Sequence, residues 1–294
     1  DPNGQDDVLV YNPEIHIPVD KPVKFLLRSK DVLHDFAVAQ FRVKMDLVPG
    51  MQTFLWLTPT REGRFEILCE ELCGVGHHTM RGAVIVDSSS DFEHWLAQQT
   101  TYSAQVSKPA GNAAVGAAQY GVCATCHGAQ GEGNPLMNAP KLAGQPAWYL
   151  KRQVMNYKRG LRGSDPADNF GQQMIGMVAT LANEQAVDNV VAHIGTFPDS
   201  PVDATVEGDV AAGAKSYAVC AYCHGKDGMG VQALNAPRLQ GMSDWYLARQ
   251  LAAFRDDVRG AHPQDYYGFQ MGLMGQSARD EQAVNDLIAY INTL

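Results

Sequence analysis

The second half of this 294-residue chain contains an ungapped internal repeat, in which residues 97 positions apart are aligned. The aligned pairs are Cys123 with Cys220, Cys126 with Cys223, His127 with His224, Pro140 with Pro237, Trp148 with Trp245, Tyr149 with Tyr246, and Gln153 with Gln250. Each copy also ends with apolar residues at helical spacing. The repeat therefore predicts two all-α domains, residues 111–197 and 208–294, joined by a linker at 198–207.

Each copy contains the sequence C-x-x-C-H. This spacing lets two thiols bond to the two vinyl groups of one haem while the adjoining histidine binds its iron. A redox dithiol or half of a zinc site would also use C-x-x-C, but neither explains the histidine or the duplication. The sequence predicts two covalently bound haem c groups, held by Cys123, Cys126 and His127 in the first copy and by Cys220, Cys223 and His224 in the second.

The second axial ligand of each iron can be sought with the repeat. Only two pairs of methionines are aligned by it, Met174 with Met271 and Met177 with Met274, and both are expected on the loop that leads to the closing helix. We favour Met174 and Met271, because the later pair is nearer the start of that helix. Histidine–methionine ligation raises the reduction potential relative to bis-histidine ligation and fills both axial positions, so these haems are expected to carry electrons.

A third site is indicated by the twelve residues that begin at Cys69. Cys73 follows four residues later, His77 four after that, and Met80 three further on. Thiolate, imidazole and thioether together form a donor set that suits copper, whereas zinc normally takes four strong nitrogen or sulfur donors. Two thiolates could bridge two copper ions. Two alternatives to this copper site remain. A disulfide between Cys69 and Cys73 would leave the other donors unexplained, and His78 rather than His77 could be the imidazole ligand.

This region resembles the binuclear CuA domain of cytochrome c oxidase subunit II. The resemblance rests on Val32–Phe36, Arg42–Gly50 and the Cys69–Met80 segment, and it covers roughly residues 8 to 88. The ligands that it implies are His34, Cys69, the backbone carbonyl of Glu71, Cys73, His77 and Met80.

By the same resemblance, the two cysteines bridge both copper ions. His34 and Met80 complete one ion, and His77 with the Glu71 carbonyl completes the other. The Glu71 carboxylate would face the catalytic subunit, where the family places a magnesium ion.

The tandem copies resemble periplasmic dihaem cytochromes c built from two class I domains. The shared motifs are Pro140–Gly144, Trp148–Leu150 and Met174 before Leu181, with Pro237–Gly241, Trp245–Leu247 and Met271 in the second copy, where Ala278 replaces the leucine. The resemblance implies that the carbonyls of Pro140 and Pro237 accept a hydrogen bond from the axial histidines.

The fold class expected for the whole chain is multidomain. An all-β, cupredoxin-like Greek-key barrel at residues 1–98 is followed by a linker at 99–110 and the two all-α cytochrome c domains. Alternating or apolar runs predict short strands at residues 8–17, 23–27, 52–57, 65–69 and 82–86.

Composition limits the setting in which such a chain works. The formal net charge of −9 argues against nucleic acid as a partner, and the three cysteine pairs account for all six cysteines, so no structural disulfide is expected. No apolar run is long enough to span a membrane. Because the family has a membrane hairpin ahead of this region, we expect a periplasmic piece of a subunit that is membrane-anchored in its full-length form.

The predicted function is electron entry into a haem–copper terminal oxidase of the caa type, with one extra haem. Electrons would pass from a cytochrome c or another external donor, through two c-type haems and CuA, to catalytic subunit I, which alone would reduce oxygen. The alternatives are a free periplasmic electron shuttle and the CuA and cytochrome c subunit of a nitric or nitrous oxide reductase.

Overall fold

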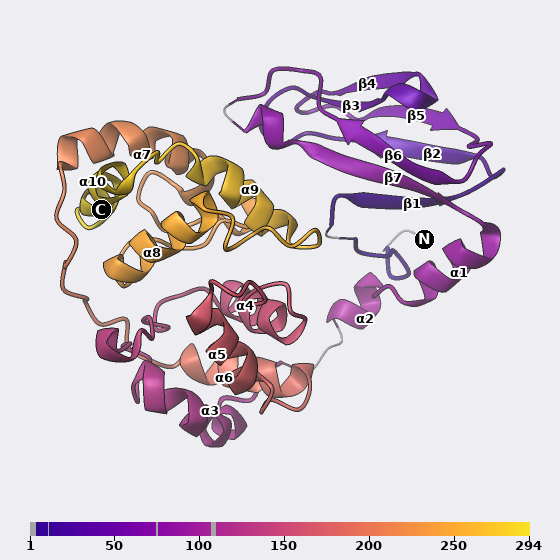
Figure 1. Cartoon of the computed structure of the whole chain (residues 1–294). Coiled ribbons are helices and arrows are strands. Elements are labelled where there is room, and N and C mark those ends of the chain that lie inside the picture. The colour runs from indigo at the N-terminus through magenta and orange to yellow at the C-terminus, as the bar shows by residue number, and fades with distance from the viewer. Residues whose placement is uncertain (1–3, 11, 75, 107–109) are drawn as a thin grey trace. The chain divides into compact units, whose positions relative to one another are not determined.

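In the computed structural model the chain forms two compact units, residues 1–108 and 109–294 (Figure 1). The structure describes residues 4–10, 12–74, 76–106 and 110–294. The division between the units falls inside the linker predicted at 99–110, and the two repeat copies form one unit together. No described helix is both long and apolar enough to cross a bilayer.

The first unit contains seven described strands: β1 (Glu14–Pro18), β2 (Val23–Leu27), β3 (His34–Val38), β4 (Val43–Leu47), β5 (Thr53–Leu57), β6 (Gly63–Leu68) and β7 (Arg81–Asp87). A five-stranded sheet has the order β1-β7-β6-β3-β4, in which β1 runs parallel to β7 and the other pairs are antiparallel. β2 and β5 form a second, antiparallel sheet. The cupredoxin-like fold expected for this region is confirmed.

The core of this unit is built from residues that alternate along the strands. Phe25 and Leu55 point inward from the smaller sheet, and Phe36, Phe65 and Val84 point inward from the larger one. Since successive side chains on a strand face opposite sides, such alternation buries one face of each sheet. The metal-ligand loops therefore extend from a packed scaffold.

Two expectations for this unit were wrong in detail. The strand predicted at residues 8–17 begins only at Glu14, because Pro13 has no N–H for a strand ladder; its carbonyl instead accepts from Ala83 N. The linker predicted at 99–110 contains a short helix, α2 (Tyr102–Val106). It follows α1 (Ser89–Ala97), which Ser88 caps by accepting from Asp91 N.

The second unit repeats one set of four helices. They are α3 (Ala113–His127), α4 (Ala147–Lys158), α5 (Asn169–Val178) and α6 (Glu184–Ile194) in the first copy, and α7 (Val210–His224), α8 (Asp244–Arg255), α9 (Tyr266–Gly275) and α10 (Glu281–Ile291) in the second. The predicted all-α architecture is confirmed. In each copy the first and last helices pack together (Figure 1).

The segments that carry the candidate methionines are helical, although a loop was expected there. Asp168 starts α5 by accepting a hydrogen bond from Gly171 N, and Asp265 starts α9 by accepting from Gly268 N. A side-chain cap of this kind satisfies an N–H that a helix start leaves unpaired, and the sequence analysis did not weigh it.

Candidate metal and haem sites

The thiol loop lies between β6 and β7 and folds back on itself. Cys69 N donates to Met80 O, which extends the β6–β7 ladder by one more pair. Gly74 has a positive φ of 126°, which a residue with a side chain rarely adopts, and a 3₁₀ turn at His77–Thr79 follows. These local features turn the loop so that its four side-chain donors face one another.

The distances between the donors are short. The Cys73 sulfur lies 3.7 Å from the Cys69 sulfur, 3.4 Å from His77 Nδ1 and 3.2 Å from Met80 Sδ. The backbone carbonyl of Glu71 is 3.3 Å from the Cys69 sulfur. The structure thus gathers the five predicted ligand positions that belong to this loop.

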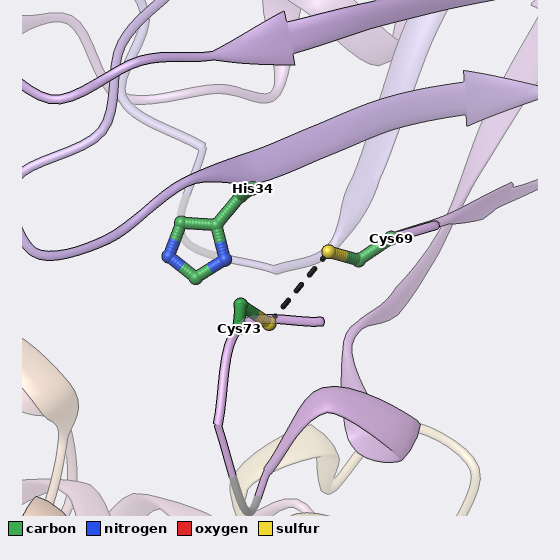
Figure 2. A group of neighbouring side chains, drawn as sticks. All are labelled: His34, Cys69 and Cys73. Atoms are coloured by element: carbon green, nitrogen blue, oxygen red, sulfur yellow. Dashed lines mark hydrogen bonds between the residues drawn. The ribbon is translucent and has the colours of Figure 1, made fainter. Parts of the chain in front are cut away.

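His34 comes to this group from β3, on a different part of the chain. Its imidazole and the two thiols have ligand atoms that all lie within 4.8 Å of one another, and Figure 2 shows the ring beside both cysteines. His34 Nε2 is 2.8 Å from an Asp31 carboxylate oxygen. A carboxylate on one imidazole nitrogen orients the ring and leaves the other nitrogen free to bind a metal.

Two observations indicate that His34 and the two thiols could hold a metal ion. His34 Nδ1 is buried and has no hydrogen-bond partner among the described residues, which is costly unless a metal binds there. Burial, reinforced by the neighbouring Cys69 thiol, raises the pKa of Cys73 to about 11. The Cys73 thiol therefore resists ionisation, and a bound cation would supply the positive charge that favours its thiolate.

The carboxylate of Glu71 has a different partner from its carbonyl. Glu71 Oε1 lies 3.2 Å from Lys44 Nζ, which also lies 3.4 Å from Asp35 and 3.8 Å from Glu70. His78, the alternative to His77 as the imidazole ligand, has an exposed side chain. The structure therefore separates the Glu71 carboxylate, for which magnesium was predicted, from the donors around the two thiols.

Each cytochrome copy contains a large apolar cavity lined by its C-x-x-C-H residues. Both candidate methionines line it in each copy, Met174 and Met177 in the first, Met271 and Met274 in the second. All four side chains are half-buried. Neither the lining nor the burial distinguishes the two pairs, so Met174 and Met271 remain a prediction.

The two axial histidines are oriented by the hydrogen bonds that the resemblance implied. His127 Nδ1 is 2.8 Å from the Pro140 carbonyl, and His224 Nδ1 is 2.8 Å from the Pro237 carbonyl. A carbonyl only accepts, so Nδ1 carries the proton and Nε2 keeps a lone pair for a metal. Burial lowers the pKa of both histidines despite this hydrogen bond, which favours the neutral ring that ligation needs.

The two copies meet through pairs of residues that the repeat aligns. Arg162 donates to Gln153 of its own copy and to Tyr246 and Gln250 of the other. The equivalent Arg259 donates to Gln250, Tyr149 and Gln153. Those two tyrosines and two glutamines line both cavities, so the cavities share a wall.

This wall is rich in positive charge. Arg152 donates to Asn235 of the other copy, and Arg249 donates to Asn138. Within the described part of the chain, amides, phenols and carbonyls accept the hydrogen bonds of these two arginines and of Arg162 and Arg259. The buried Nε atoms of Arg162 and Arg259 have no hydrogen-bond partner among the described residues.

Buried cations are stable only when anions pair with them. A haem carries two propionate carboxylates, which would supply anions for the buried guanidinium groups of Arg162 and Arg259. The cavities therefore fit haem in shape, in axial donors and in charge. These arginines were not predicted from the sequence, although four of their partners, the aligned tyrosines Tyr149 and Tyr246 and the aligned glutamines Gln153 and Gln250, were noted in the repeat.

Fold and sites together define a class of protein in which a cupredoxin-like domain with a dithiolate loop is fused to a tandem pair of C-x-x-C-H domains. The chain belongs to the cytochrome c family over residues 113–197 and 210–294, and its residues 2–88 match the periplasmic domain of cytochrome c oxidase subunit II. The two resemblances inferred from the motifs are confirmed.

Individual relatives match one half of the chain or the other. The alternative cytochrome c oxidase subunit 2 of Bradyrhizobium diazoefficiens is 57% identical over 103 residues, which are 35% of this chain and 37% of that protein. Cytochrome c4 of Pseudomonas aeruginosa is 33% identical over 158 residues, 51% of this chain and 74% of that one. The chain thus spans little more than a third of the oxidase subunit.

Among solved structures, the thiosulfate dehydrogenase TsdBA of Marichromatium purpuratum matches 62% of this chain and 40% of its own, with 27% identity and a TM-score of 0.50. Reduced cytochrome c4 from Pseudomonas stutzeri matches 63% of this chain and all of its own, with 26% identity and a TM-score of 0.49.

Proposed function

We propose that this chain is the electron-entry part of a haem–copper oxidase, in which two c-type haems and a binuclear CuA centre carry electrons towards catalytic subunit I. The observation that carries the proposal is the meeting of a histidine from β3 with two thiols, an imidazole, a thioether and a carbonyl on one loop. Softer and harder donors in this combination suit copper.

In this proposal Cys69 and Cys73 would serve both coppers, His34 and Met80 would be further donors to one of them, and His77 and the Glu71 carbonyl would be further donors to the other. When bound, copper and haem iron supply reversible one-electron carriers. His34 is held on strand β3 and the other donors on the loop between β6 and β7 of the same packed sheet, so the geometry is expected to change little between oxidation states. Small reorganisation of this kind favours fast electron transfer.

His127 and His224 would each hold the iron of one haem, with Met174 and Met271 as the second protein ligands. Two protein ligands to each iron would leave no position for oxygen, so in this proposal the chain transfers electrons and oxygen reduction belongs to another subunit. The shared wall of tyrosines, glutamines and arginines places the two cavities next to each other and supports transfer between the haems.

The partners follow from this role. Catalytic subunit I receives the electrons, and a cytochrome c or another external redox protein supplies them. The match to a periplasmic domain places the chain in the periplasm, and we propose that the full-length protein is anchored in the bacterial inner membrane. A magnesium ion at the Glu71 carboxylate would require that group to release Lys44.

The test is a spectroscopic count of cofactors in the purified chain. We expect an electron paramagnetic resonance signal of a mixed-valence copper pair, together with a pyridine haemochrome absorbance equal to two haems per chain. Zinc in place of copper, or a single copper, would contradict the binuclear site. One haem per chain would contradict the tandem arrangement without affecting the copper assignment.

A further inference from the structure

The linker between the two cytochrome copies contains a carboxylate that joins equivalent basic residues of both. Asp199 Oδ1 lies 2.7 Å from Lys141 Nζ, and Asp199 Oδ2 lies 2.5 Å from Arg238 Nη1. Lys141 and Arg238 are aligned by the repeat. One residue of the linker therefore uses its two oxygens for the same position in each copy.

The two basic side chains also cross to the opposite copy. Lys141 Nζ donates to the carbonyl of Gly241 at 2.9 Å, and Arg238 Nη1 donates to the carbonyl of Gly144 at 3.2 Å. Gly144 has a φ of +80°, and a side chain there would collide with the Asp199 carboxylate. The glycine is therefore required both for the turn and for the approach of the linker.

The two cations in this cluster are buried, whereas the carboxylate that joins them is partly exposed. The side chain of Lys141 is 2% exposed and that of Arg238 is 10% exposed, while Asp199 is 42% exposed. Burial would raise the pKa of the Asp199 carboxyl, but hydrogen bonds from Lys141 and Arg238 outweigh it and hold that pKa below its ordinary value. Asp199 is the anion in ion-pair contact with both buried cations.

Each basic residue of this cluster directly follows the proline whose carbonyl orients an axial histidine: Lys141 follows Pro140, and Arg238 follows Pro237. The Pro140 carbonyl that accepts from His127 belongs to the same peptide group as Lys141 N, which donates to Ser243 Oγ of the other copy at 3.0 Å. The Pro237 carbonyl that accepts from His224 likewise belongs to the peptide group that begins Arg238. Movement of either basic residue would tilt one of these carbonyls.

We propose that Asp199 is a positioning residue for both haem sites: through Lys141 and Arg238 it holds the two proline carbonyls that orient the axial histidines. This inference rests on the proposed function, because it needs haem in both cavities. A strong hydrogen bond from Nδ1–H makes an imidazole a better donor to oxidised iron. Loss of Asp199 weakens both hydrogen bonds and so raises both reduction potentials.

The experiment compares Asp199→Asn with Asp203→Asn in the full chain carrying copper and haems. Asp203 is exposed in the same linker, so its substitution removes the same charge without touching the cluster. Spectroelectrochemical titration is expected to show both haem potentials raised in Asp199→Asn relative to Asp203→Asn. Nuclear magnetic resonance of ¹⁵N-histidine-labelled protein is expected to show several-fold faster solvent exchange of both Nδ1 protons.

Asp199→Glu keeps the carboxylate and is expected to return potentials and exchange rates towards the wild-type values. Potentials and exchange rates in Asp199→Asn equal to those of Asp203→Asn would overturn the inference. A change at only one haem would overturn the claim that one carboxylate serves both. A wild-type chain that binds fewer than two haems would contradict the proposed function itself, and the haemochrome count separates that outcome from the other two.

Discussion

His127 and His224 show how single residues acquire a defined role from their hydrogen-bond partners. Each has its Nδ1 proton directed to a proline carbonyl and its ring buried, so the ring is neutral and Nε2 is available. His34 has the reverse arrangement: its Nε2 is paired with the Asp31 carboxylate, and its Nδ1 has no hydrogen-bond partner among the described residues. In all three cases the outer partner decides which nitrogen is left available to a metal.

The choice between the two methionine pairs is tested at this scale. Met174→Ala is expected to open one axial position, so that the ferrous first haem binds carbon monoxide and its Soret band shifts. Met177→Ala is the matched control because it lines the same cavity, three residues along α5. Carbon monoxide binding by Met177→Ala alone would reverse our assignment for both copies.

At the scale of elements, two glycines allow the first and last helices of each copy to pack closely. A side chain at Gly116 would collide with the Asn189 carbonyl of α6, and one at Gly213 would collide with the Asp286 carbonyl of α10. Close approach of helix backbones needs a small residue at the crossing point. The repeat retains glycine at both positions, although glycine weakens a helix interior.

Gly116→Ala is therefore expected to lower the free energy of unfolding of the cytochrome unit by about 2 kcal/mol, because it forces these helices apart. Gly121→Ala, on the same helix and with nothing within 4 Å, is the control and is expected to raise it by roughly 0.5 to 1 kcal/mol. The second copy already has Ala218 at that position. Urea unfolding followed by circular dichroism measures both, and equal effects would exclude the crossing as the cause.

The linker is also attached to the second copy by a buried carboxylate. Asp244 is 1% exposed and accepts hydrogen bonds from Thr205, Val206 and Asn292, among others. Burial would raise the pKa of this carboxyl, but the hydrogen bonds, first from the backbone N–H groups of Thr205 and Val206, outweigh it and lower the pKa. One side chain thus joins the linker, the start of α8 and the end of α10.

Because the folded-state pKa of Asp244 is lowered, its ionised form stabilises the fold above the unfolded-state value of about 4, and this contribution is lost as the pH falls through the folded-state pKa. Asp244→Asn should cost about 2 to 3 kcal/mol at pH 7. The difference from wild type should shrink as the pH falls below the unfolded-state value of about 4 and through the lower folded-state pKa. Urea titrations across that range test this, with Asp203→Asn as control, and a constant difference would contradict it.

At the scale of the whole molecule, the chain combines two units with separate cores. The β unit packs around Phe25, Phe36 and Val84, whereas each cytochrome copy has its own core, around Val187 in the first and Ile288 in the second. The copies are joined by paired arginines and the Asp199 cluster into one compact unit. Stability of the copper unit and of the cytochrome unit should therefore respond to different ligands.

Removal of copper with a chelator is expected to lower the melting temperature of the β unit by at least about 10 °C, because ligands that bind only the folded state stabilise it. The transition of the cytochrome unit, followed at the Soret band, should stay where it is. Calorimetry with and without copper measures both transitions. A common shift would show that the two units unfold together.

The sequence by itself determined the chemistry of this protein. The C-x-x-C-H motifs and the donors of the Cys69–Met80 loop are close in the chain, so their spacing alone limits what they can bind. The repeat also predicted that both copies would share one fold, and their helices begin and end at aligned residues. Residues only a few positions apart stay close in space whatever the rest of the chain does, so a short motif can be interpreted without the tertiary structure.

Only the tertiary structure decided how distant segments meet. It brought His34 with its Asp31 partner to the thiol loop, closed each cavity with arginines and tyrosines from both copies, and turned Asp199 of the linker towards Lys141 and Arg238. It also made helices of the methionine segments, through caps that the sequence analysis had not weighed. These contacts depend on how whole helices and strands pack against one another. They join residues that are far apart in the chain, and no spacing in the sequence predicts such contacts.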